Sequence, residues 1–116
     1  MGMTRDPVFG PLVMFGLGGI LVEVLRDVSF RIAPFDREEA RRMMREIRGA
    51  GLLDAVRGSP PADRGAVEDV LLRVARLVTD CPEIAELDVN PLMAMPSGAV
   101  AADARVMLTP LPPKQF

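Results

Sequence analysis

The most informative segment of the chain reads Ile84-Ala85-Glu86-Leu87-Asp88-Val89-Asn90. Apolar Leu87 and Val89 alternate with Glu86, Asp88 and Asn90, and this period of two is typical of a half-exposed β-strand. Such a strand turns its apolar side chains toward a core and its three oxygen-bearing side chains toward the opposite face. The segment therefore predicts a sheet with one buried face and a polar cluster on the other.

Two amphipathic helices are predicted upstream of this strand. Asp36 with Glu39 resembles a capping box, and apolar residues then recur at helical spacing as far as Ile47. Asp63 is the expected N-cap of a second helix, which ends before Pro82. The apolar stripe of this second helix consists of Val67, Val70, Leu71, Val74, Leu77 and Val78.

Further strands are expected on both sides of the helices. Leu12–Phe15 and Ile20–Leu25 are predicted as buried strands joined by a glycine-rich turn, and Val28–Ile32 as a half-exposed strand. Ala99–Val106 is predicted as one strand of small residues after a turn. Strands, then two helices, then strands indicate the α+β class. We expect a mainly antiparallel sheet that is covered on one face by two helices.

The composition fits one globular domain. The chain has 116 residues, of which 49% are hydrophobic, and a formal net charge of −2, which excludes disorder and a strongly basic nucleic-acid binder. The absence of His excludes a His-based triad and a zinc site with His ligands. The uncharged run 7–22 is too short and too rich in glycine to span a membrane, and the single Cys81 cannot form an internal disulfide. We expect a cytoplasmic protein without membrane or nucleic-acid partners.

Three hard oxygen donors are candidate Mg²⁺ ligands. Asp88 and Asn90 share one predicted strand, and Asp103 lies on the next. Mg²⁺ prefers one or two carboxylates together with water and phosphate oxygens. Half-exposed strands also carry polar residues on their wet face as a matter of course, and the pattern alone favours that simpler interpretation.

A glycine-rich segment and a carboxylate form a second candidate site. Gly16, Gly18 and Gly19 could provide a backbone nest for a phosphate, although a tight turn is the simpler interpretation of such a cluster. Glu23 interrupts an apolar run, so its carboxylate requires a cation or a hydrogen-bond donor. That partner is either a bound ligand or a structural arginine such as Arg31, and both interpretations stay open.

Several ordered motifs together resemble one known family. They are Arg5-Asp6-Pro7-Val8-Phe9-Gly10-Pro11, Met14-Phe15-Gly16-Leu17-Gly18-Gly19, Pro82 to Leu92 with its Asp88-Val89-Asn90-Pro91 core, and Asp103-Ala104-Arg105. The chain resembles the C-terminal half of the ATP-grasp domain of ADP-forming acyl-CoA synthetases, which are similar to succinyl-CoA synthetase. Similar domains are fused to acetyltransferase modules in bacterial protein lysine acetyltransferases. The resemblance runs from about Gly2 to about Val106.

The resemblance implies a function for the candidate residues. Asn90 and Asp103 correspond to the Mg²⁺ ligands of the family, and Asp88 to the acidic position two residues before that Asn. Gly16, Gly18, Gly19 and Glu23 are the expected nucleotide- and phosphate-binding residues, and ATP or ADP with Mg²⁺ is the expected cofactor pair. The family interconverts acyl-CoA, ADP and phosphate with the free acid, CoA and ATP.

The resemblance also implies that the chain is incomplete on its own. We expect a partial ATP-grasp domain over residues 1–108 and a flexible tail over 109–116. The expected partners are the remaining ATP-grasp half and a CoA-binding domain or subunit, with a homo-oligomer as a further possibility. The chain alone is expected to be inactive. The alternative is a non-catalytic half-domain that acts in dimerisation or regulation, for example of a protein acetyltransferase.

Overall fold

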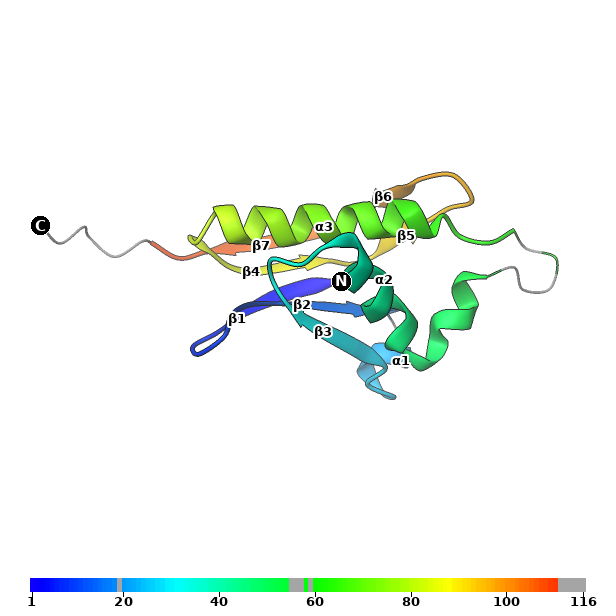
Figure 1. Ribbon diagram of the computed structural model, residues 1–116, viewed down its shortest axis with the longest axis horizontal. Helices are drawn as coiled ribbons and strands as arrows, with labels where there is room; N and C mark the ends of the chain where they lie inside the picture. The colour runs from blue at the N-terminus through cyan, green and yellow to red at the C-terminus, as the bar shows by residue number, and fades with distance from the viewer. Residues whose placement is uncertain (19, 55–57, 59, 111–116) are drawn as a thin grey trace, which may run out of the picture.

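The computed structural model describes residues 1–18, 20–54, 58 and 60–110. Its main feature is a five-stranded sheet in the order β3-β2-β1-β4-β7, in which all neighbouring strands are antiparallel (Figure 1). These strands are β1 (Gly2–Asp6), β2 (Gly10–Gly16), β3 (Val28–Ile32), β4 (Ile84–Val89) and β7 (Ala104–Leu108). A separate hairpin pairs β5 (Leu92–Ala94) with β6 (Ala99–Ala101). The predicted α+β class is confirmed.

Two helices cover one face of the sheet, as expected. In α2 (Arg37–Glu46) the Asp36 carboxylate accepts a hydrogen bond from the Glu39 N–H at 2.9 Å. In α3 (Arg64–Asp80) the Asp63 carboxylate accepts from the Ala66 N–H at 3.0 Å. Both predicted N-caps are therefore confirmed, because each satisfies a backbone donor that the first helical turn leaves free. A 3₁₀ helix, η1 (Arg48–Leu53), follows α2.

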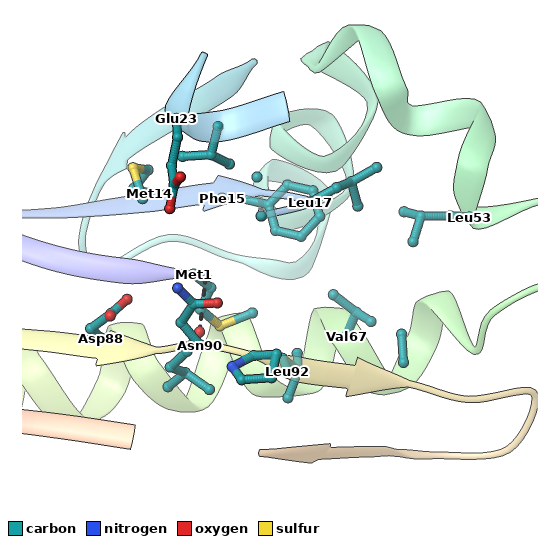
Figure 2. Close-up of a pocket in the computed structure, with 16 residues that line it drawn as sticks. Met1, Met14, Phe15, Leu17, Glu23, Leu53, Val67, Asp88, Asn90 and Leu92 are labelled. Atoms are coloured by element: carbon teal, nitrogen blue, oxygen red, sulfur yellow. Dashed lines mark hydrogen bonds between the residues drawn. The ribbon is translucent and has the colours of Figure 1, made fainter. Parts of the chain in front are cut away.

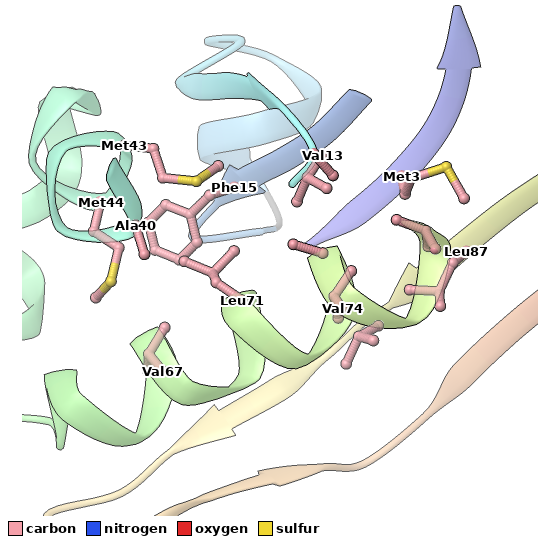
Figure 3. Packing of buried hydrophobic residues seen from close by; sticks show 14 of the residues in the cluster. Met3, Val13, Phe15, Ala40, Met43, Met44, Val67, Leu71, Val74 and Leu87 are labelled. Atoms are coloured by element: carbon pink, nitrogen blue, oxygen red, sulfur yellow. The ribbon is translucent and has the colours of Figure 1, made fainter. Parts of the chain in front are cut away.

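The core lies between the sheet and these two helices (Figure 3). Phe15 of β2 packs among residues of both helices, including Met43 of α2 and Leu71 of α3, which are fully buried. Farther along α3, Val74 belongs to the same buried cluster as Met3 of β1 and Leu87 of β4. The apolar positions that recur at helical spacing in the sequence thus face the sheet, as amphipathic packing requires.

Arg5 connects three segments that are distant in sequence. Its guanidinium donates to the carbonyl of Ile84 at 2.6 Å and to the carbonyls of Val78 and Cys81 at 2.8 and 3.0 Å. Two of these acceptors, the carbonyls of Val78 and Cys81, lie at the end of α3, where the last carbonyls have no backbone N–H donor within the helix. Arg5 therefore fixes the end of α3 to the start of β4 and to β1.

The predicted strand over Ile20–Leu25 is wrong. A single helical turn, α1 (Ile20–Glu23), stands there, and β3 takes the place beside β2. The chain reverses direction through Arg26, whose backbone lies in the left-handed region with a φ of 52°. Pairing of β2 with β3 overrides the β-propensity of the branched residues, since strand propensity depends on context.

Two further differences concern strands. β1 occupies the middle of the sheet, where no strand was predicted. The sequence pattern did not indicate it because Met3 is its only side chain in the apolar core. The single strand predicted over Ala99–Val106 is two strands, β6 and β7, which belong to different sheets. Gly19 and residues 111–116 of the predicted tail lie outside the described residues. No described helix is long and apolar enough to cross a membrane.

Candidate functional site

The end of β4 positions two of the predicted site residues. Leu87 and Val89 are buried against the helix side, so the alternation of the strand turns Asp88 toward the opposite, exposed side. Asn90 follows the strand directly, and its N–H donates to the carbonyl of Asp103 at 3.1 Å. Asp88 and Asn90 are therefore held by backbone pairing on a central strand rather than by a loose loop.

The glycine segment reaches the same place from the other side. Gly16 ends β2 and approaches α1 so closely that a Cβ there would lie 2.8 Å from Val22 Cγ2. Gly18 has a φ of +78°, a conformation that side chains rarely adopt, and a Cβ on it would lie 3.9 Å from Asn90 Oδ1. Gly16 is thus required by the lack of space for a side chain, and Gly18 by its backbone conformation. As a result, the backbone at Gly18 lies close to Asn90.

These segments surround one cavity of about 140 Å³. Figure 2 shows Glu23 on one side of it and Asp88 and Asn90 on the other. Gly16 and Gly18 line the same cavity. The remaining wall is largely apolar and is formed by Met1, Met14, Phe15, Leu17, Val22, Leu53, Val67, Val89, Pro91, Leu92 and Ala94. Five of the seven residues predicted for the site therefore meet around one space, although they come from segments more than 60 positions apart in the chain.

The other two residues predicted for the site are Asp103 and Gly19, of which the structure describes Asp103. The side chain of Asp103 is exposed, accepts a hydrogen bond from the Ala104 N–H at 2.9 Å, and does not line the cavity. Its backbone lies beside Asn90, so it borders the site without forming its wall. Gly19 is outside the described residues. Within the described part of the chain, no three His, Cys, Asp or Glu side chains cluster in a way that could hold a metal ion.

The structure bears on one of the two partners considered for Glu23, the structural arginine Arg31. Arg31 forms ion pairs with Glu39 and Glu46 of α2 and not with Glu23. These pairs lower the pKa of both glutamates, because hydrogen bonds from the guanidinium favour the charged carboxylates. The interpretation of Arg31 as the partner of Glu23 is therefore wrong, and the exposed Glu23 carboxylate faces the cavity.

Sequence reasoning missed the residues that position this site. The buried Asp27 accepts hydrogen bonds from the N–H groups of Arg48 and Gly49 at 2.6 and 2.7 Å, which fixes the turn after α1 to the start of η1. Met14 and Leu53 line the cavity but read in the sequence as ordinary apolar residues. The one signal in the sequence was that Asp27 is acidic and lies next to an apolar strand, so that its buried carboxylate needs hydrogen-bond donors.

The arrangement can bind a cation and an anion side by side. A carboxylate and an amide oxygen from the end of β4 lie across the cavity from Glu23, and these are hard ligands that suit Mg²⁺. The glycine segment offers backbone with no side chain in the way, which permits close approach of a phosphate group.

Comparisons with known proteins identify the family of this chain. Residues 1–108 match the ATP-grasp domain family. The chain belongs to this ATP-grasp family. It is 52% identical over 108 residues to acetate–CoA ligase [ADP-forming] I of Archaeoglobus fulgidus and 50% identical over 108 residues to the beta subunit of acetate–CoA ligase [ADP-forming] I of Pyrococcus furiosus. These matches cover 93% of this ATP-grasp chain but only 16% and 47% of the two relatives.

Solved structures of a further relative share the fold. The dinucleotide-forming acetyl-coenzyme A synthetase 1 of Ca. Korarchaeum cryptofilum, in its apo form, superposes with a TM-score of 0.91 at 48% identity. The match covers 93% of this chain and 51% of that one. Another structure of that enzyme, with a TM-score of 0.89, contains coenzyme A and Mg-AMPPCP, with its phosphohistidine segment pointing towards the nucleotide binding site. The ATP-grasp chain thus spans about half or less of the relatives it matches.

Proposed function

We propose that this chain is the Mg²⁺-nucleotide- and phosphate-binding part of an ADP-forming acyl-CoA synthetase. The reaction of the complete assembly converts an acyl-CoA, ADP and phosphate into the free acid, CoA and ATP. The chain requires the other ATP-grasp half and a CoA-binding domain or subunit, because it covers 47% of a relative that is itself only a beta subunit. Alone, it is inactive in acyl-CoA turnover.

One observation carries this proposal. Glu23, Asp88 and Asn90 meet with the glycine segment around a single cavity, although nothing in their local sequences requires them to meet. If Asp88 and Asn90 were only solvent-exposed polar residues of a strand, their position opposite Glu23 and the glycine backbone would be a coincidence. Mg-AMPPCP in a relative that is 48% identical supports the same assignment.

The donor set fits Mg²⁺ that is shared with a nucleotide. Asn90 and Asp88 would hold the ion, with Asp103 next to Asn90 as the third expected ligand and the glycine backbone next to the phosphates. Mg²⁺ commonly binds through one or two carboxylates plus phosphate and water oxygens, so a site without three clustered acidic residues suits it. Bound there, Mg²⁺ offsets phosphate charge during phosphoryl transfer.

Calorimetric titration of the chain with Mg·ADP and Mg·ATP tests the proposal. We expect saturable binding that requires the metal and weakens about 10- to 100-fold in Asn90→Ala and Asp88→Asn, because each variant removes a charged or metal-bound contact. Asp103→Ala tests the third ligand in the same way. Glu86→Gln is the matched control, since Glu86 lies on the same strand but does not line the cavity.

Two outcomes would contradict the assignment. A folded chain that binds neither nucleotide at millimolar concentration, alone or mixed with the other ATP-grasp half, favours the alternative of a non-catalytic half-domain. Binding that is weakened by Glu86→Gln but unchanged by Asn90→Ala would place the nucleotide elsewhere on the sheet.

A further inference from the structure

The two edges of the five-stranded sheet are protected to different degrees. At one edge, β3 carries Arg31, whose guanidinium donates to the Phe30 carbonyl at 2.7 Å and forms ion pairs with Glu39 and Glu46 of α2. A charged side chain anchored in this way hinders the addition of another strand. The β3 edge is therefore partly protected against strand pairing by Arg31.

Within residues 1–110 as far as the structure describes them, no side chain protects the β7 edge in a comparable way. Among the described residues β7 pairs only with β4, and all five of its residues are exposed. Val106, Met107 and Leu108 are three consecutive apolar residues with exposed fractions of 52%, 52% and 66%. Arg105 is the only charged residue of the strand. An exposed apolar edge of this kind is a template for pairing with another strand.

The pairing with β4 determines which backbone groups of β7 are available. The Asp103 carbonyl accepts from the Asn90 N–H, and the Thr109 N–H donates to the Glu83 carbonyl at 2.8 Å, so odd-numbered positions face β4. In an antiparallel ladder the groups of alternate residues point in opposite directions. The N–H and C=O groups of Ala104, Val106 and Leu108 therefore point away from the sheet.

We propose that a second copy of this chain pairs with β7 through its own β7, antiparallel, with the two-fold axis at Val106. This register places Val106 opposite Val106 and Ala104 opposite Leu108, which are the residues with outward backbone groups. Each such pair exchanges two hydrogen bonds, giving about six across the axis. The result is a continuous ten-stranded sheet, built from two five-stranded ones.

The side chains favour a second copy and this register. Arg105 lies opposite Met107 of the second copy, so no like charges face each other, whereas an axis at Arg105 would bring two guanidinium groups together. Val106 and Leu108 project to the opposite face from Arg105, and there each gains apolar side chains of the second copy as neighbours. The axis at Val106 also gives the longest overlap of β7 with itself. This dimer does not depend on the nucleotide-binding role.

Sedimentation equilibrium of the chain from about 1 μM to about 1 mM measures the association. We expect a reversible dimer, and at least about tenfold weaker association in Val106→Lys, because two lysines then face each other across the axis. Val100→Lys is the matched control: Val100 is 53% exposed, but on β6, and its substitution leaves association unchanged. Thermal unfolding checks that both variants are folded.

A mixing experiment tests the axis itself. At a concentration where Val106→Lys and Val106→Glu are each monomeric, an equimolar mixture of the two is expected to form a one-to-one dimer, because only a residue on the two-fold axis meets its own counterpart. The proposal is overturned if the unmodified chain stays monomeric over the whole range. It is equally overturned if Val106→Lys associates as well as Val100→Lys, or if the mixture stays monomeric.

Discussion

Two phenylalanines on neighbouring strands have very different surroundings. Phe15 of β2 is 4% exposed beneath α2 and α3, whereas Phe30 of β3 is 47% exposed on the opposite face of the same sheet. Strand alternation alone separates them, since Phe15 pairs with Ser29 and Phe30 with Met14. The same residue type is thus part of the core on one face of the sheet and exposed to solvent on the other.

The contrast extends across all five strands. On the covered face, one row of paired residues runs Arg31–Val13–Met3–Leu87–Val106, and its three central members are buried. On the open face, the adjacent row runs Phe30–Met14–Gly2–Asp88–Arg105. These five residues line a groove of about 380 Å³, and Met14 and Asp88 also line the cavity of the candidate site. The covered face thus forms the core, whereas the open face contributes Met14 and Asp88 to the cavity of the candidate site.

Phe15→Ala should break the covered face and have the largest effect. Removing a buried aromatic ring from a packed core costs about 3–5 kcal/mol of unfolding free energy, because transfer energy is lost and a cavity remains. Urea unfolding followed by circular dichroism measures the change. Phe15→Leu retains most of the apolar volume and should lose less. An effect below about 1 kcal/mol would contradict the assigned core position.

Arg5→Met should have the next largest effect. The variant leaves three backbone carbonyls, those of Val78, Cys81 and Ile84, without their shared charged donor. We expect a loss of about 2–3 kcal/mol in the same unfolding assay, since hydrogen bonds to a charged group contribute more than neutral ones. Arg73→Met, at an exposed position of α3, is the control and should change stability little.

Local signals were sufficient for the elements that form the covered face. Asp36 and Asp63, each followed by apolar residues at helical spacing, located α2 and α3, and the alternation around Leu87 located β4. β1 could not be found in this way, because a central strand with one core side chain is defined by backbone pairing rather than by its pattern. The helical turn α1 was missed because its branched residues are typical of a strand, whereas β3 takes the place beside β2.

The candidate site was only partly predictable. Spacing placed Asp88 and Asn90 at the end of one strand, but spacing favoured an ordinary polar face, and the family resemblance was needed to single them out. The meeting of Glu23 with these two residues is a tertiary result, since it depends on the close approach of α1 to Gly16. Asp103 stays a predicted ligand, because its backbone carbonyl accepts from Asn90 but its side chain does not line the cavity.

Acid should weaken the junction between the core helix and the β5–β6 hairpin. The Asp63 carboxylate accepts from the N–H groups of Gly98 and Ala66, and these hydrogen bonds lower its pKa. A carboxyl whose pKa is lowered by folding stabilises the protein above its ordinary pKa, and this contribution is lost as the pH falls through the lower value. Asp63→Asn keeps an oxygen for the Ala66 N–H, but its amide nitrogen cannot accept from Gly98.

Unfolding at neutral pH and at about pH 3 tests this junction. We expect Asp63→Asn to be less stable than the unmodified chain at neutral pH, with the difference shrinking in acid as the native carboxylate is protonated. Asp36→Asn is the control, because Asp36 caps α2 through the Glu39 N–H alone and Asn can make that bond. A difference that stays constant with pH would contradict the role of the charge.

Phe30→Ala should have the smallest effect and sharpen the contrast with Phe15→Ala. About half of this ring is already in contact with water, so its removal leaves no closed cavity and costs about 1 kcal/mol or less. The same urea assay, run at low and high protein concentration, measures it. A loss as large as that of Phe15→Ala would mean that the open face is covered in solution, and a loss that grows with concentration would identify the cover as a second copy. A small loss at both concentrations would mean that the open face is uncovered in solution, as the proposed nucleotide-binding role requires.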